Sequence, residues 1–280
     1  MAAVSPLVDV HCHLYYPEFA EDLPEVLEHA RNLGVKKICC VSHDAKTARK
    51  IIDMAKQSDL VVPLAAAHPV QEDGACVTRD TVEEAVRFVR DHHDHLAGIG
   101  ECGLDFSPFV VNGPDRDERK ARQRWALEEF VKLSREYELP LNVHSRSAGR
   151  PTIQLLQQAN ARWVNMHAFD GSTKVARQAL ASGYYFSVPP SVVRGPDRQR
   201  QIGDLPLGSL LLESDAPALG PVKGERNVPG NVVLSAREIA RIKGVTYEQV
   251  AAATTENAKR LFPKLFSAPQ KSGMPTLVAD

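Results

Sequence analysis

The chain has 280 residues, of which 43% are hydrophobic and 25% are charged, and its formal net charge is -1 at pH 7. This length suffices for one large domain with a full core, and the near-neutral charge excludes a protein that binds nucleic acid through a broad positive field. No apolar run reaches the ~18 residues needed to cross a bilayer, and the first residues lack the basic start and apolar stretch of a signal peptide. The five cysteines are odd in number and mostly lie in apolar segments, which predicts reduced core thiols. We therefore expect an intracellular protein of the nucleus or cytoplasm that is not secreted.

Eight short segments rich in Val, Ile and Leu alternate with helical patterns along the chain. They predict strands at 7–14, 36–42, 61–68, 97–104, 140–144, 163–167, 184–188 and 209–215. Short apolar strands are typical of buried parallel sheets, and alternation with helices implies right-handed crossovers. We therefore predict the α/β class and a single (β/α)8 barrel of the TIM type over residues 1–266. Residues 267–280 are polar and lack periodicity, which predicts a flexible carboxyl-terminal tail.

The segments between the predicted strands carry the apolar spacing of helices. Apolar residues stand at positions 82, 85, 86 and 89 in one segment and at 126, 130, 133 and 137 in another. Three capping boxes predict where helices begin, at Thr81-x-x-Glu84, Ser235-x-x-Glu238 and Thr246-x-x-Gln249.

The first predicted strand carries the strongest local signal, Asp9-Val10-His11-Cys12-His13. Side chains alternate along a strand, so His11 and His13 point to the same side, and Asp9 shares their face one step deeper. Two imidazoles at this spacing can bind one cation. Two buried structural histidines are the alternative, but a His-x-His at a strand end favours metal binding.

Later predicted strands also end in residues that can bind a metal. Glu101 follows Gly100, and its two carboxylate oxygens can bridge two cations. His144, His167 and Asp215 end the fifth, sixth and eighth segments, and Asp215 can also accept a proton from water. Each of these histidines alone fits a core or surface role equally well, but the carboxyl ends of barrel strands meet at one mouth. Six residues together therefore predict a metal centre: His11, His13, Glu101, His144, His167 and Asp215.

Three further residues are candidates for contact with a substrate. His68 ends the third predicted strand, where it either contacts the substrate or makes a structural hydrogen bond. Basic residues lie in loops after the strands, and the planar guanidinium of arginine matches phosphate oxygens. We expect Arg146 and Arg226 to contact a phosphodiester, although each alone is also typical of an ordinary surface residue.

Together these motifs resemble those of the TatD family of metal-dependent deoxyribonucleases, within the amidohydrolase-like barrels. The resemblance runs through Asp9-x-His11-x-His13, Gly100-Glu101-x-Gly103-Leu104-Asp105, His144-x-Arg146, His167-x-Phe169-x-Gly171-Ser172, Glu213-Ser214-Asp215-x-Pro217 and Asn257-Ala-x-Arg260-Leu-Phe262. Any one motif is weak, whereas the set in this order is specific and spans nearly the whole chain. The sequence departs at Val228, where the family commonly has Glu, and at Ser214, which replaces the usual Thr.

The resemblance implies a barrel that holds two or more divalent cations, such as zinc, manganese or magnesium, and hydrolyses DNA phosphodiesters as a 3′ exonuclease, an abasic-site endonuclease or both. We expect Glu101 to bridge two metals about 3.5–4 Å apart. His11, His13 and Asp215 would complete one site, and His144 and His167 the other. Catalysis is assigned to Glu101 and Asp215. We further expect a monomer with DNA as its substrate, no membrane association and no obligate protein partner.

Two alternatives remain open at this stage. A hydrolase of the same barrel class could act on amides, lactones or small phosphoesters. Many such enzymes bridge their metals with a modified Lys at the end of the fourth strand, where this chain has Glu101. A non-catalytic scaffold for nucleic acid or protein is the other alternative, but it would be expected to lose ligands and keep a basic surface, the reverse of this sequence.

Overall fold

A computed structural model describes residues 5–266, and within them eight strands alternate with helices. The strands are β1 (Leu7–Cys12), β2 (Val35–Cys40), β3 (Val61–Pro63), β4 (Ile99–Gly103), β5 (Leu141–His144), β6 (Val164–Met166), β7 (Tyr185–Val188) and β8 (Leu210–Leu212). Every predicted strand is present. Most end earlier than predicted, by one to five residues.

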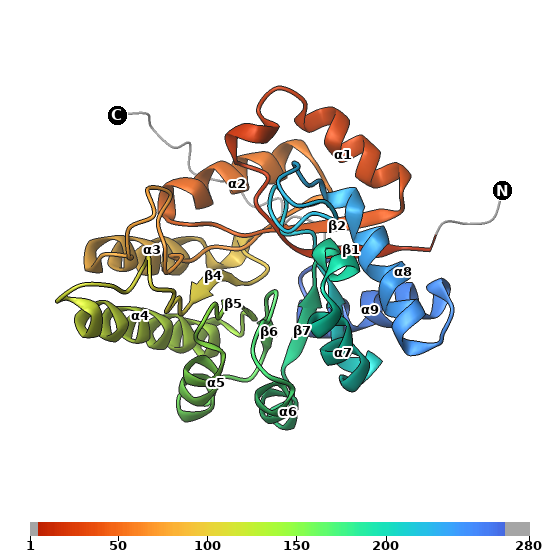
Figure 1. The fold of residues 1–280 in the computed structure, drawn as a ribbon. Coiled ribbons are helices and arrows are strands. Elements are labelled where there is room, and N and C mark those ends of the chain that lie inside the picture. Colours follow the sequence, from red (N-terminus) through yellow and green to blue (C-terminus); the bar gives the residue numbers. More distant parts are fainter. Residues whose placement is uncertain (1–4, 267–280) are drawn as a thin grey trace.

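The strands pair in parallel and close into a barrel (Figure 1). They form a three-stranded sheet in the order β1-β2-β3 and a five-stranded sheet in the order β4-β5-β6-β7-β8. Two seams join these sheets. Leu64 and Gly98 form a parallel bridge beside β3 and β4, and the N–H of Asp215 donates to the carbonyl of His11 at 2.9 Å between β8 and β1. The predicted α/β class and (β/α)8 barrel are confirmed.

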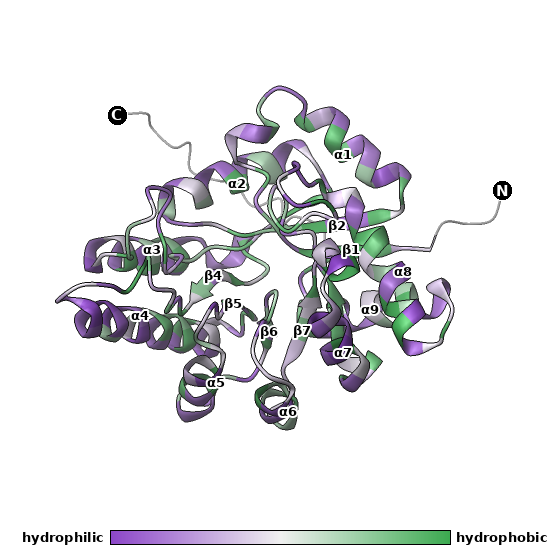
Figure 2. Cartoon of the chain, in the orientation of Figure 1, coloured by the Kyte–Doolittle hydropathy of each residue, from purple (hydrophilic) through white to green (hydrophobic). Residues whose placement is uncertain are grey.

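Helices surround the strands (Figure 1) and turn their apolar sides inward. They are α1 (Leu23–Asn32), α2 (Ala45–Gln57), α3 (Arg79–His92), α4 (Arg116–Tyr137), α5 (Gly149–Gln158), α6 (Thr173–Ala181), α7 (Pro196–Asp204), α8 (Val232–Lys243) and α9 (Tyr247–Leu261). Figure 2 shows hydrophobic and hydrophilic residues on opposite sides of several of them. In α3 the predicted positions 82, 85, 86 and 89 are all buried. Within the described part of the chain, no helix combines the length and apolar character needed to cross a membrane.

Only one of the three predicted capping boxes caps a helix. The Thr246 hydroxyl accepts from the Gln249 N–H, and the Gln249 side chain accepts from the Thr246 N–H at the start of α9. Thr81 and Ser235 instead lie inside α3 and α8. The true cap of α3 is Thr78, whose hydroxyl accepts from the Thr81 N–H. The two predictions were wrong because a Thr or Ser three residues before a Glu also fits one face of a helix interior.

The carboxyl-terminal helix α9 covers the end of the barrel opposite the mouth. The Thr255 hydroxyl donates to the carbonyl of Pro6, and the Asn257 amide donates to that of Leu210, both at 2.8 Å. These bonds fix α9 to the amino ends of β1 and β8. Phe262 follows the helix, is fully buried, and packs with apolar side chains of β1, β2, β3 and β8.

The structure also tests the prediction about the cysteines. All five cysteines are buried and free of disulfide bonds, as expected of core thiols. The predicted tail, 267–280, lies outside the described residues.

Replacing Phe262 with alanine should lower the free energy of unfolding by about 3–5 kcal/mol, the usual cost of removing a buried aromatic side chain. Phe266 offers a matched control, because its side chain is 43% exposed whereas that of Phe262 is 0% exposed. Phe266→Ala should change the free energy of unfolding by no more than about 0.5 kcal/mol. Urea denaturation of both variants measures the difference, and equal losses would contradict the role given to Phe262.

Candidate metal centre

The structure brings all six predicted metal-binding residues together at the mouth of the barrel. They are His11 at the end of β1, His13 just after it, Glu101 in β4, His144 at the end of β5, His167 after β6 and Asp215 after β8. Their side chains are buried or nearly so. Because parallel strands present their carboxyl ends at one face, residues far apart in the sequence become neighbours here.

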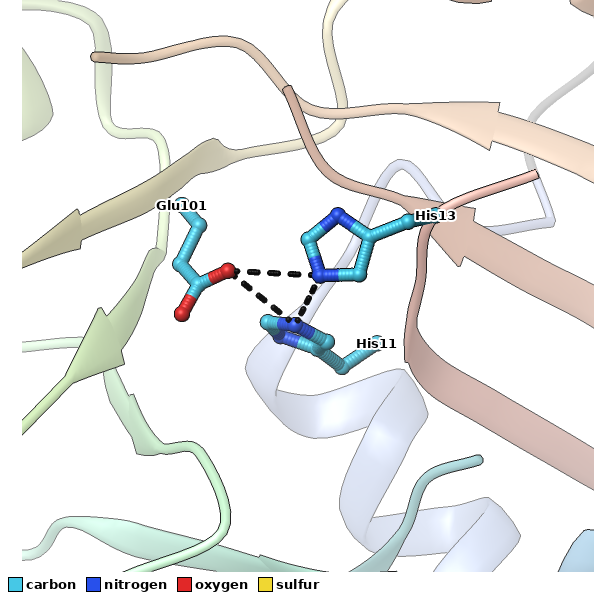
Figure 3. A group of neighbouring side chains, drawn as sticks. All are labelled: His11, His13 and Glu101. Carbon is cyan, nitrogen blue, oxygen red and sulfur yellow. Dashed lines mark hydrogen bonds and ion pairs between the residues drawn. The ribbon is translucent and has the colours of Figure 1, made fainter. Parts of the chain in front are cut away.

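Four ligand atoms form a compact group on one side of Glu101, and Figure 3 shows three of the residues. The Nε2 atoms of His11 and His13 are 3.2 Å apart, and they lie 3.3 and 3.4 Å from Oε2 of Glu101. Both nitrogens are 3.4 Å from Oδ1 of Asp215. The atoms of His11, His13 and Glu101 form a nearly equilateral triangle whose corners lie about 1.9 Å from its centre, close to the Zn–N and Zn–O bond lengths. These three atoms therefore fit a single cation, and Asp215 lies beside them.

The orientation of His11 also favours a cation. Its Nδ1 is 2.8 Å from Oδ1 of Asn142, and the Asn142 amide nitrogen donates to the carbonyl of Val10 at 2.7 Å. The Asn142 oxygen can only accept, so His11 carries a proton on Nδ1 and directs Nε2 at the site. Nδ1 of His13 is 3.3 Å from the Tyr15 hydroxyl, which orients the ring and can either donate or accept. The two Nε2 atoms face each other at 3.2 Å, so either a proton or a cation can lie between them.

The pKa values of His11 and His13 are shifted in opposite directions. Burial lowers the pKa of His11, but the carboxylates of Glu101 and Asp215 outweigh it and raise that pKa well above its usual value. Burial and the neighbouring His11 hold the pKa of His13 below its usual value. The histidine pair therefore binds one proton in the absence of metal. A divalent ion would balance the two negative charges of Glu101 and Asp215 better than one proton does.

A second group of nitrogens faces the other oxygen of Glu101. Oε1 lies 2.7 Å from Nδ1 of His144, 3.4 Å from Nε2 of His68 and 3.9 Å from Nε2 of His167. Glu101 thus directs one oxygen to each group, as a carboxylate that bridges two metals does. His68, predicted to contact the substrate, is nearer to this oxygen than His167, so it is also placed to bind a cation.

Carboxylates behind the second group orient its histidines. Nδ1 of His167 is 2.7 Å from Oε2 of Glu213, and Nε2 of His144 is 3.0 Å from Oδ2 of Asp105. Burial lowers the pKa of His144, but its bonds to Asp105 and Glu101 raise it to about 9. Metal-binding histidines commonly donate their second ring N–H to such carboxylates, which fixes the ring.

Sequence reasoning assigned no role to Asn142, Asp105 or Glu213, although Asp105 and Glu213 stand in the motifs that resemble the TatD family. The alternation of a strand would have found Asn142, which lies two residues before His144 in β5 and shares its face. Glu213 and Asp215 both follow the end of β8, so alternation does not relate them.

The departures of the sequence from the TatD pattern have plain structural outcomes. The Ser214 hydroxyl donates to Oδ2 of the buried Asp9 at 2.5 Å, so serine keeps the hydroxyl that threonine would supply. Asp9 also accepts from the Ser214 and His11 N–H groups and supports the centre from below. Burial raises the pKa of Asp9 to about 7. Val228 is half-buried and packs against the core.

The two predicted arginines are both paired with carboxylates. Arg146 reaches Oδ2 of Asp105 through Nε at 2.8 Å and Nη2 at 2.7 Å, which places it next to His144. Arg226 forms two bonds with Asp22, at 2.9 and 2.6 Å, on another part of the rim. Arg146 therefore adjoins the centre, whereas Arg226 does not contact it. Both substrate contacts remain predictions.

Comparison with known proteins identifies the relatives of this chain. The sequence pattern of the family described as TatD related DNase matches residues 8–263. A human protein named Deoxyribonuclease TATDN3 is 44% identical over 276 residues, which cover 96% of this chain and 99% of that protein. An uncharacterized metal-dependent hydrolase of Bacillus subtilis, YabD, is 32% identical and covers 91% of this chain and 98% of its own length. The crystal structure of the TatD homologue YJJV from Escherichia coli superposes with a TM-score of 0.83 at 26% identity, and covers 93% of this chain and 99% of that one.

The Glu101→Gln variant should lose bound metal, because an amide replaces a charge shared by both groups of nitrogens. We expect metal affinity to fall more than about 100-fold, beyond the loss typical of residues that only orient ligands. Elemental analysis after dialysis measures it, with Glu84→Gln on the exposed face of α3 as the control. Full metal content in Glu101→Gln would show that the carboxylate is not shared.

The Asn142→Leu variant should weaken metal binding about 10–100-fold, because His11 loses the acceptor that fixes its ring. The Asn142→Asp variant keeps an acceptor in that place and should retain most of the affinity. Titration with a chromophoric chelator compares the two proteins. Equal affinity in both would mean that the ring of His11 is fixed by other contacts.

Proposed function

Because the chain belongs to the family of TatD related DNases, we propose that it is a divalent-metal-dependent deoxyribonuclease that hydrolyses phosphodiester bonds of DNA. The observation that supports this most directly is the placement of Glu101, with one oxygen toward His11 and His13 and the other toward His144. When bound, two cations would make water a stronger nucleophile and stabilise charge on the phosphate oxygens.

The donor set points to the kind of metal. His11, His13, Asp215 and Glu101 offer two nitrogens and two carboxylate oxygens, a donor set that suits zinc. Magnesium prefers oxygen ligands in an octahedron, so a histidine-rich site favours a transition metal such as zinc or manganese. We assign two ions, with His144 and His167 holding the second.

Asp215 is the proposed proton acceptor. Its Oδ1 lies 3.4 Å from the nitrogens of His11 and His13 and 3.8 Å from that of His167, so it stands between the two groups. Burial raises the pKa of Asp215, but His167 and the bonds to His11 and His13 outweigh it and hold that pKa far below its usual value. The carboxylate stays ionised and can accept a proton from the attacking water.

Residues beside the centre would position the scissile phosphate. Arg146 is 47% exposed and is fixed by Asp105, so its remaining donors can face a phosphate oxygen. His68 stands beside Glu101 and can donate to the same phosphate if it does not bind metal. The side chain of Arg226 would meet DNA only farther along the rim.

The experiment that tests the function is a metal-dependent time course on end-labelled DNA. Single strands, duplexes and duplexes with one abasic site should be compared, because 3′ trimming yields a ladder and abasic-site cleavage yields one product. We expect cleavage that stops with chelator and returns with metal. Hydrolysis of lactones or cyclic amides without cleavage of DNA would instead indicate the other branch of the barrel class. The monomeric state and the nuclear or cytoplasmic location expected from the sequence remain predictions.

Replacing Asp215 with asparagine should slow DNA cleavage at saturating metal by at least about 100-fold, the low end for loss of a general base. The fold should be kept, because Asp215 lies at the mouth rather than in the apolar core. Steady-state cleavage and circular dichroism measure the two effects, with Asp53→Asn on the exposed side of α2 as control. A near-wild-type rate would refute this role.

A further inference from the structure

Arg198, in the first turn of α7, holds a half-buried guanidinium beside the proposed metal centre. Its Nη2 donates to the carbonyl oxygen of Ala168 at 2.9 Å. Ala168 directly follows His167, and its N–H donates to Oε1 of Glu213, the same carboxylate that bonds to His167. The guanidinium therefore lies one peptide away from a proposed ligand, at the mouth of the barrel.

The charge of Arg198 is not neutralised by the protein. Among the residues that the structure describes, no carboxylate lies within 4.0 Å of its guanidinium nitrogens. Asp170 and Glu213 act on it only from a greater distance, and burial lowers its pKa, although an arginine stays charged. By contrast, Arg146 and Arg226 each have a carboxylate partner.

A half-buried guanidinium without a carboxylate partner can bind an anion. Partial desolvation of its charge is costly, and an anion at this place would offset that cost. The guanidinium has five N–H donors, and its bond to the Ala168 carbonyl uses one of them. The free donors form a planar fork that suits two oxygens of a phosphate.

We propose that Arg198 binds a backbone phosphate of the DNA, next to the phosphate that is cleaved. This inference rests on the proposed deoxyribonuclease function. The cleaved phosphate would lie over Glu101 and Asp215, whereas Arg198 contacts the carbonyl of Ala168 in the loop after β6, so the two positions are different. The loops after the seventh and eighth strands of TIM barrels frequently hold phosphate groups, and α7 follows β7. With a net charge of -1, the chain needs a few well-placed cations rather than a broad basic surface.

The competing role for Arg198 is to dock α7 on the loop after β6. Gln201 lies three residues later in the same helix, and its amide nitrogen donates to the carbonyl of Gly171 in that loop. Gln201 thus makes the same kind of contact without a charge. Variants at Arg198 and Gln201 therefore distinguish an effect of helix docking from an effect of the positive charge.

The experiment compares Arg198→Gln, Arg198→Lys and Gln201→Met with the wild type. A fluorescein-labelled single-stranded oligonucleotide is titrated at several salt concentrations, with calcium or another cation found not to support turnover, and DNA cleavage is measured separately with the active metal.

Arg198→Gln should weaken binding about tenfold, as expected for a hydrogen bond to a charged group. It should reduce the slope of log Kd against log salt by about 0.7, the value for one phosphate in a single strand. KM should rise while kcat changes less than about twofold, because the contact is remote from the reacting atoms. Arg198→Lys should keep the slope, and Gln201→Met should keep both slope and KM.

The outcomes distinguish a failure of the proposed phosphate contact from a failure of the proposed function. If the wild type binds and cleaves DNA and Arg198→Gln keeps its slope and KM, the phosphate contact is wrong and the proposed function stands. If Gln201→Met reproduces the losses of Arg198→Gln, docking rather than charge explains them and the phosphate contact is again wrong. If the wild type binds DNA through Arg198 without cleaving it, the contact stands and the proposed hydrolysis fails. A wild type that neither binds nor cleaves DNA overturns both.

Discussion

The carboxylate of Glu101 is the element on which the rest of the structure depends. One of its oxygens lies within 3.4 Å of two imidazole nitrogens, and the other lies 2.7 Å from a third. Burying these groups together is costly unless each is paired, and protons or cations between the carboxylate and the imidazoles can provide that pairing. The backbone makes this approach possible, because β4 and β5 touch more closely than side chains would allow. A Cβ at Gly100 would lie 2.7 Å from that of Asn142, and one at Gly103, where φ is +148°, would lie 2.1 Å from the His144 carbonyl oxygen.

Beneath the candidate ligands, polar side chains occupy positions that an ordinary barrel would fill with apolar ones. Asn142 bonds to His11 and to the Val10 carbonyl, while Asn165 donates to Ser187 at 2.8 Å. The Ser187 hydroxyl in turn donates to Glu213. Such a network gives up apolar contact, but it fixes the direction of each ring nitrogen. The apolar floor around Phe262 and the packing of the helices supply the stability that this layer does not.

The fold and the gathering of the candidate ligands at one mouth could be predicted because both follow from strand alternation and barrel topology. Strand alternation put His11 and His13 on one side, and barrel topology brought Glu101 and Asp215 to the same mouth. The orienting contacts and the state of each arginine could not be predicted in that way. Arg226 pairs with Asp22, 204 positions away in the sequence, and Arg198 meets the loop after β6 through the docking of α7. Such pairings depend on how helices and loops pack, which no spacing in the sequence encodes.

The most direct test of a metal centre shared through Glu101 is anomalous diffraction from crystals of the zinc-loaded protein, with data on both sides of the zinc edge. We expect two anomalous peaks about 3.5–4 Å apart, one on each side of the Glu101 carboxylate. The first peak should lie within bonding distance of His11, His13 and Asp215, and the second peak within bonding distance of His144. A single peak, or two peaks that do not share the carboxylate of Glu101, would contradict a shared centre.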